Sequence, residues 1–406
     1  MNCILFDDIS RDNLLPLTFT RPVADIRIGI LTIREKWEKH LGVNTSSLTQ
    51  HYLSFKFPCV IHEDNLLING SVLPTNELIG EIKKLKAGQQ LVQGNHLIAF
   101  KASGKQLNDI HTSKSDPQST IDSLLEQTGF IKIQSSFKVV KIENLWDIFS
   151  KNGEAIQNDF TLLTNNRKSQ KISNSNNVFG TENIFVEEGA KIEGAILNGK
   201  TGPIYIGKDA EIMEGSMVRG PFALCEAAVL KLGAKIYGPT TIGPYSKVGG
   251  EINNSVIFGY SNKAHDGFLG NAVIGEWCNL GADTNNSNLK NNYGEVQVWN
   301  YNANEFINTG LQFCGLIMGD HSKCGINTMF NTGTVVGVNA NIFGSGFPEK
   351  FIPCFSWGGA DGWTTFSLEK AFEVGQRVWE RRNKKFDDIE KNIFTKIFEL
   401  SSKYRG

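Results

Sequence analysis

The residues best suited to acid–base chemistry lie in segment 263–267, which reads Lys-Ala-His-Asp-Gly. This segment interrupts a series of regularly spaced aliphatic residues, so its polar side chains are expected to face a cleft or a neighbouring subunit and not a core. His265 is the candidate general base, because the pKa of imidazole lies near working pH. The alternative is an exposed turn histidine without a chemical role.

The aliphatic residues around this segment recur every six positions. Eight of them keep one phase from Ile206 to Val248, and a second run of five apolar residues at the same spacing extends from Met318 to Ile342. A period of six fits neither an α-helix nor a long amphipathic strand, but it suits a triangular coil whose units each supply one short strand and one turn. Glycine favours the same interpretation, since 30 of the 41 glycines fall within 171–365. The sequence therefore predicts a parallel β-helix, and an antiparallel β-sandwich would not hold this phase.

The repeat is broken at two places. The register slips after Val248 and recovers near Leu269, and a segment rich in Asn, Tyr and Trp interrupts it over 283–312. Loops that leave a rigid solenoid commonly carry function, although a tolerated surface insertion would leave the same pattern.

Segment 263–282, KAHDGFLGNAVIGEWCNLGA, resembles the acetyltransferase core of the bifunctional N-acetylglucosamine-1-phosphate uridylyltransferase family nearly position for position. Segment 319–327 resembles the corresponding coils of archaeal-type sugar-phosphate nucleotidylyltransferases that carry the same tail. The resemblance implies a left-handed hexapeptide β-helix, a homotrimer, and acetyl-CoA as the acyl donor.

The same resemblance implies roles for individual residues. His265 would take the proton as the amine of an amino-sugar phosphate attacks the thioester. Asn288 would orient the imidazole or bind the sugar, and backbone N–H groups near Ala282 would stabilise the oxyanion. The implied substrate contacts are Asn279, Lys263, Lys290, Phe268 and Ala282.

This chain departs from the family pattern in three places. Phe268 stands where the family has an aromatic hydroxyl, and Asp283 stands where it has glycine. The coil before the histidine reads Val-Gly-Gly-Glu over 248–251, where the family has a basic pair that binds phosphate. Loss of those cations leaves the acceptor open, so glucosamine-1-phosphate need not be the substrate.

Residues 1–172 have the composition of an α/β domain, with an apolar strand expected over 3–6 and a helix over 30–37. Segment 14–22, LLPLTFTRP, resembles the Pro-Leu-Thr segment of sugar nucleotidylyltransferases. In those enzymes the opening strand leads into a glycine-rich loop that cradles the nucleotide phosphates. Here that loop reads FDDISRD over 6–12, and the first glycine is Gly29.

Two interpretations of this first domain stay open. In the first, it is a divergent sugar nucleotidylyltransferase in which Arg11 and Arg21 face the triphosphate and Asp7 or Asp8 holds Mg²⁺. In the second, it is a degenerate relative that binds a nucleotide sugar weakly or serves as a scaffold.

The last segment, 356–406, is expected to be a helical extension. Glycine nearly vanishes after 366, apolar residues fall on one face over 368–379, and a second helix is expected over 386–404. Because amphipathic helices need a partner, this tail is predicted to cover the last coil or to pack on a neighbouring subunit.

Charge and hydropathy exclude several classes of protein. Lys and Arg total 41 against 42 Asp and Glu, so no bulk field would attract nucleic acid or an anionic membrane. No run approaches 18 apolar residues, and the start has no signal-peptide pattern, so a cytoplasmic protein is expected.

Together these observations predict three domains, 1–172, 173–355 and 356–406. The predicted protein is a sugar-phosphate nucleotidylyltransferase and acetyltransferase that makes UDP-N-acetylglucosamine or a related nucleotide sugar, with sugar phosphates and nucleoside triphosphates as its ligands. The alternatives are a nucleotidylyltransferase with a purely structural β-helix, and a non-catalytic subunit that binds nucleotide sugar.

Overall fold

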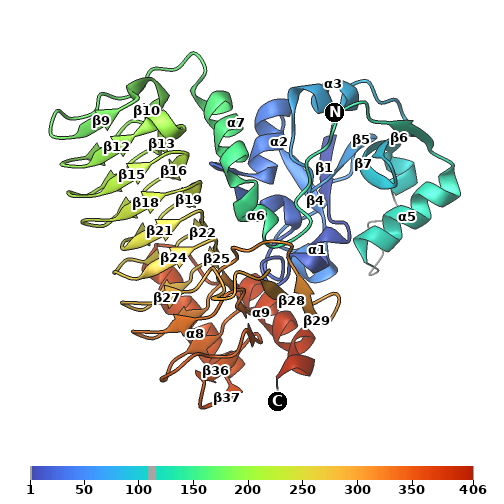
Figure 1. Ribbon diagram of the computed structural model, residues 1–406. Helices are drawn as coiled ribbons and strands as arrows, with labels where there is room; N and C mark the ends of the chain where they lie inside the picture. Colours follow the sequence, from blue (N-terminus) through green and yellow to red (C-terminus); the bar gives the residue numbers. More distant parts are fainter. Residues whose placement is uncertain (1, 108–115, 406) are drawn as a thin grey trace. The chain divides into compact units, whose positions relative to one another are not determined.

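A computed structural model describes residues 2–107 and 116–405, which form two compact units (Figure 1). The first unit comprises the residues up to Leu14, Thr20–Ile26 and Leu31–Asn144. The second comprises Leu15–Phe19, Arg27–Ile30 and the chain from Leu145 onward. The three-domain division expected from the sequence stays a prediction.

The first unit is built on a six-stranded mixed sheet, ordered β4-β1-β5-β7-β6-β8. Strand β1 pairs in parallel with β4 and β5, whereas β7 is antiparallel to its neighbours β5 and β6. One face of the sheet buries a cluster that includes Ile4, Phe6 and Phe100. The strands are β1 (Asn2–Phe6), β4 (Thr45–Leu48), β5 (Asp64–Asn69), β6 (Gln89–Gln93), β7 (His96–Ser103) and β8 (Ile131–Gln134).

Helix α2 (Ile33–Leu41) begins three residues later than the sequence predicts. Thr32 caps it, since its side chain accepts a hydrogen bond from the N–H of Glu35 while the Glu35 carboxylate accepts one from the N–H of Thr32. The helix ends at Gly42, whose left-handed φ of 70° favours glycine. The other short elements of this unit are α1 (Ser10–Asn13), η1 (Val23–Asp25), β3 (Leu31–Thr32), η2 (His51–Leu53), α3 (Asn76–Ile82) and α5 (Pro117–Thr128).

The second unit contains a parallel β-helix with three faces, which confirms the predicted fold class (Figure 1). The eight aliphatic residues from Ile206 to Val248 that define the repeat are each no more than 1% exposed. Their side chains stack inside the prism, where burial of apolar surface stabilises the coil.

The first face has nine strands: β10 (Ile184–Val186), β13 (Ile204–Ile206), β16 (Phe222–Leu224), β19 (Thr240–Ile242), β22 (Val256–Gly259), β25 (Val273–Glu276), β30 (Ile317–Met318), β33 (Val335–Val336) and β35 (Phe351–Ile352). The second face has ten strands: β11 (Lys191–Ile192), β14 (Glu211–Ile212), β17 (Val229–Leu230), β20 (Lys247–Val248), β23 (Asn262–Lys263), β26 (Asn279–Leu280), β31 (Lys323–Cys324), β34 (Asn341–Ile342), β36 (Ser356–Gly359) and β37 (Gly362–Thr365).

The third face has six strands: β9 (Asn177–Phe179), β12 (Ile196–Asn198), β15 (Met217–Arg219), β18 (Lys235–Tyr237), β21 (Glu251–Asn253) and β24 (Phe268–Gly270). The interruption after Asp283 contains one strand of a separate parallel pair, β27 (Asn285–Asn286) with β32 (Met329–Phe330), and a hairpin, β28 (Gln297–Asn300) with β29 (Glu305–Asn308). Short 3₁₀ turns complete the early coils, η3 (Thr181–Asn183) and η4 (Gly199–Thr201).

Helices α6 (Asp147–Ser150) and α7 (Asn152–Thr164) precede the β-helix, and strand β2 (Arg27–Ile28) belongs to the same unit. The side chain of Asn152 accepts a hydrogen bond from the N–H of Gly29 at 2.7 Å and lies 3.1 Å from the hydroxyl of Thr241. Arg27 donates to the carbonyls of Ile30 and Phe258. A short N-terminal segment is therefore part of the β-helix unit.

The tail forms α8 (Leu368–Glu380), α9 (Asp388–Leu400) and η5 (Ser402–Tyr404), as the two expected helices. The second helix begins later than expected because the side chain of Asp387 caps it by accepting from two backbone N–H groups. No helix in the described ranges is long and apolar enough to cross a membrane.

These helices dock on a column of rings that we call the aromatic corner: Tyr245, Tyr260, Trp277 and His321. All four residues have left-handed φ values at the same corner of successive coils. The rings of Tyr260 and Trp277 stack with centroids 4.2 Å apart. Trp379 of α8 stacks on Trp277 at 5.1 Å, and Phe394 of α9 meets the ring of His321 at 4.9 Å. His321 is thus a buried packing residue.

Candidate active site

The second face of the β-helix forms the floor of the candidate site. Its strands pair in register, which aligns four outward-facing side chains on successive coils: Lys247, Asn262, Asn279 and Lys323. Neighbouring strands lie about 4.8 Å apart, so these side chains make a polar ladder. The alternating positions, such as Val248 and Leu280, point into the prism.

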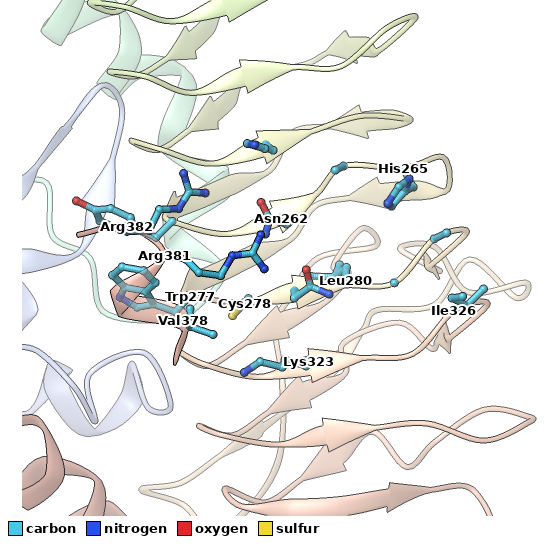
Figure 2. Close-up of a pocket in the computed structure, with 16 residues that line it drawn as sticks. Asn262, His265, Trp277, Cys278, Leu280, Lys323, Ile326, Val378, Arg381 and Arg382 are labelled. Carbon is cyan, nitrogen blue, oxygen red and sulfur yellow. The ribbon is translucent and has the colours of Figure 1, made fainter. Parts of the chain in front are cut away.

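Helix α8 and the turn after it close this floor into a cavity of about 710 Å³. Figure 2 shows His265 at one end of the cavity and Trp277 with Arg382 at the other. The complete lining consists of Lys247, Tyr260, Asn262, Ala264, His265, Trp277, Cys278, Asn279, Leu280, Gly281, Ala282, Lys323, Ile326, Val378, Arg381 and Arg382.

His265 lies on an exposed turn at the rim of this cavity. Among the described residues, none forms a hydrogen bond with its imidazole, so a ring nitrogen is available to a ligand. The structure brings Asn279 and Ala282, two of the expected substrate contacts, into the same lining. The N–H of Gly281 already donates to the carbonyl of Cys324 at 3.1 Å, which leaves the N–H of Ala282 as the candidate oxyanion donor.

Lys263 lies inside the prism, so the expectation that the polar residues of this segment all face outward is wrong for it. The register pairs it with Val248, and it is 2% exposed. Its ammonium group donates to the carbonyls of His265 at 2.5 Å and Asp266 at 2.8 Å, and burial lowers its pKa to about 8. This placement fits a residue that shapes the His265 turn better than one that contacts substrate.

Three other expected contacts lie outside the described lining of the cavity. The amide of Asn288 donates to the side chain of Asn271 at 2.8 Å. The N–H of Phe268 donates to the side chain of Asn285, and the ammonium of Lys290 donates to a carbonyl of its own loop. Roles for Asn288, Phe268 and Lys290 stay predictions.

The cavity is strongly cationic. Four lining residues carry a positive charge, and the lining, all of it in described ranges, includes no carboxylate. Lys323 is half-buried, and desolvation lowers its pKa to about 8. Sequence analysis predicted none of these four cations, because no local pattern places Arg381 and Arg382 beside a histidine more than 100 residues earlier.

In the first unit, polar residues gather where parallel strands end. Asp7 and Asp8 follow β1, Thr49 follows β4, and Asn69 ends β5. The chain runs from β1 to β4 on one side and then to β5 on the other, and ligands of α/β folds bind at such a switch point. Lys141 completes the cluster, and sequence analysis missed it because 133 residues separate it from Asp8.

The two carboxylates differ in environment. Asp7 is buried and accepts hydrogen bonds from the N–H of Val23 and the hydroxyl of Thr49; burial raises its pKa to about 6. Asp8 is also buried, but the ammonium of Lys141 at 3.0 Å and the amide of Asn69 at 2.7 Å hold its pKa below the usual value.

These surroundings bear on Mg²⁺ binding. Both oxygens of Asp7 already accept hydrogen bonds, and Asp8 faces an ammonium group. In the arrangement described, neither carboxylate fits a divalent cation, and no group of three metal-ligating side chains occurs among the described residues. Arg11 and Arg21, expected at a triphosphate, are both 6% exposed, and Arg11 donates to Tyr52 at 2.9 Å.

Comparisons with known proteins found one matching family model and several related sequences. Residues 3–168 match the family model described as sugar nucleotidyl transferase. A bifunctional sugar-1-phosphate nucleotidylyltransferase/acetyltransferase of Sulfurisphaera tokodaii is 31% identical over 224 residues, 54% of this chain and 51% of the relative. The bifunctional protein GlmU of Methanococcus aeolicus is 33% identical over 90 residues, 22% and 21% of the two chains.

Among solved structures, a UDP-N-acetylglucosamine acyltransferase of Arabidopsis covers 58% of this chain and 94% of its own, at 14% identity and a TM-score of 0.23. A likeness at that level carries no functional argument. The chain spans about half the length of the first relative and about a fifth of the second. Residues 3–168 are thus a sugar nucleotidyl transferase domain, followed by a hexapeptide β-solenoid, in a chain distantly homologous to bifunctional sugar-1-phosphate nucleotidylyltransferase/acetyltransferases and to GlmU.

Proposed function

We propose that this protein is a bifunctional transferase that acetylates an amino-sugar phosphate at the β-helix cavity and couples a sugar phosphate to a nucleotide in the first unit. The product would be UDP-N-acetylglucosamine or a related nucleotide sugar. The observation that carries the acetyl-transfer half is the exposed imidazole of His265, which lies without a described partner at the rim of a cavity that Asn279 also lines.

Each residue at this end has a role in the proposal. His265 accepts the proton that the acceptor amine loses as it attacks the acyl carbon. Asn279 binds the acceptor sugar, and the N–H of Ala282 donates to the oxygen that becomes negative. Acetyl-CoA would supply the thioester, whose C–S bond breaks as the amide C–N bond forms, and the CoA thiolate leaves as the thiol with the proton that His265 accepted. The resemblance of segment 263–282 implies a homotrimer, and a cytoplasmic homotrimer belongs to the same proposal.

Acetyl transfer is tested by following free thiol released from acetyl-CoA with a panel of amino-sugar phosphates. We expect His265→Ala to lower the rate by about 10²–10⁴-fold, because general-base catalysis typically contributes that much. His96→Ala is the matched control, since His96 is an exposed histidine at the start of β7. No thiol release from the wild type with any acceptor would reject the acetyltransferase and leave the β-helix as a structural element.

For the first unit, we propose that Asp8, Arg11 and Arg21 lie at the nucleotide site. The test is pyrophosphate release from nucleoside triphosphates and sugar-1-phosphates, which Asp8→Asn should lower because it removes the ion pair that positions Lys141 at this site. A second candidate function, a non-catalytic subunit that binds nucleotide sugar, is favoured by the ion pair that already occupies Asp8. In that case no product forms, yet nucleotide sugar still raises the melting temperature.

A further inference from the structure

The cavity is longer than a base and an acceptor amine require. His265 lies at one end, and the aromatic corner lies at the other (Figure 2). Tyr260 precedes His265 by five positions, and an extended chain of that length spans at most about 17 Å. A ligand that contacts both ends therefore lies along the second face of the β-helix and spans no more than about that distance.

Positive charge is concentrated at the end away from His265. The ammonium of Lys323 donates to the carbonyl of His321, which places it beside the aromatic corner. Arg382 donates to the carbonyl of Tyr245 at 3.1 Å, so its guanidinium is fixed at the same corner. Figure 2 shows the side chain of Arg381 extending over the floor near Asn262.

These cations have no carboxylate among the lining residues to neutralise them. Guanidinium groups bind phosphate through paired charge-assisted hydrogen bonds, and a desolvated ammonium gains most from an anion. Burial lowers the pKa of Lys323 to about 8, and an anion beside the ammonium would favour its charged form.

We propose that Arg381, Arg382 and Lys323 form a phosphate-binding subsite, in which the turn after α8 supplies two cations that the coil before the histidine lacks. This inference rests on the proposed acetyl transfer for its choice of ligand. The separation from His265 suits the diphosphate of an acyl-CoA, whose pantetheine arm would lie along the floor with the thioester near the imidazole. The phosphate of a nucleotide sugar is the other source of the same chemistry.

The test is calorimetric binding to the full chain of four probes: CoA, 3′-dephospho-CoA, pantetheine and UDP-N-acetylglucosamine. We expect CoA and dephospho-CoA to bind and pantetheine to bind far more weakly. The double variant Arg381→Gln/Arg382→Gln should weaken CoA by about 10-fold or more for each guanidinium removed. Arg377→Gln is the matched control, because Arg377 belongs to α8 but pairs with Glu373 outside the cavity.

A third variant keeps the test valid if the helix variants unfold. Lys323→Gln removes the subsite cation that lies on β31 of the floor and leaves α8 and the turn after it unchanged, so it should also weaken CoA by about 10-fold, whereas Lys247→Gln, which lies outside the subsite, should weaken CoA less. If only UDP-N-acetylglucosamine binds and the double variant weakens it, the phosphate subsite stands while acetyl transfer fails. If none of the phosphate-bearing probes binds, or if the folded double variant binds them all as the wild type does, the subsite is rejected.

Discussion

Lys263 occupies a position that the six-residue repeat assigns to an aliphatic side chain. A buried ammonium is costly unless hydrogen bonds compensate it, and here two turn carbonyls do so. Those carbonyls belong to His265 and Asp266, so hydrogen bonds from this buried lysine hold the exposed turn in place. The repeat alone predicted that the segment was exceptional, but not that one residue of it points inward.

Replacing this lysine tests its positioning role. Lys263→Met keeps the length of the side chain but leaves two carbonyls without their donor, so the His265 turn should shift. We expect acetyl transfer to fall by about 10²-fold through kcat, since a displacement of about 1 Å can cost that much. Lys263→Arg, which keeps the donors, should recover part of the rate. Full activity of the Met variant would show that the turn holds its shape without the lysine.

The same lysine makes stability depend on pH. Its pKa is about 8 in the folded state and 10.5 in the unfolded state, so between these values the unfolded chain binds more protons. The free energy of unfolding should therefore rise with pH from 8 to 10.5, by about 3 kcal/mol in all on account of Lys263. Urea unfolding at pH 8 and pH 10 checks this against Lys263→Met, which should lack the increment.

At the scale of elements, α8 lines the cavity and also packs on the aromatic corner. The sequence predicted this helix and its apolar face, because helical periodicity is a local property. It could not predict what the face covers, since Arg382 and Tyr245 are 137 residues apart. The ion pair of Asp8 with Lys141 escaped prediction for the same reason, whereas the β-helix was predictable because its contacts repeat at a fixed spacing.

Removing the indole of Trp379 should weaken the packing of α8 on the aromatic corner. Trp379 stacks on Trp277 and meets Phe386 edge-on at 5.7 Å, and each aromatic pair contributes about 0.5–1.5 kcal/mol. We expect Trp379→Ala to lower the free energy of unfolding by about 1–3 kcal/mol and to weaken ligand binding in the cavity. Gln376→Ala, on the exposed face of α8, should do neither. Chemical denaturation and calorimetry on the same samples separate the two effects.

At the scale of the whole molecule, the chain is not two units joined end to end. Leu15–Phe19 and Arg27–Ile30 belong to the β-helix unit although they are encoded within the first unit. The backbone N–H of Ile30 donates to the carboxylate of Asp159 at 2.8 Å, and the Gly29 carbonyl accepts from Thr241. A truncation between residues 144 and 145 therefore removes two segments of the β-helix unit.

A chain that begins at residue 145 tests this arrangement. It lacks the donors from Arg27, Gly29 and Ile30, so we expect it to melt at a lower temperature than the same unit in the full chain. A synthetic peptide of residues 14–30 should raise that melting temperature in proportion to the logarithm of its concentration. Equal melting of the truncated and full chains, with no response to the peptide, would contradict the assignment of these segments.

The stack of Trp277 on Trp379 also has an optical consequence. Two indoles whose centroids lie 5.1 Å apart, with planes 23° from parallel, are close enough for their electronic transitions to couple. Their coupled absorption should give a paired band of opposite signs in circular dichroism, one that neither ring produces alone. Loss of the contact between α8 and the aromatic corner would abolish that band and leave the helical signal intact. The intensity of the band therefore reports whether α8 is packed over the cavity.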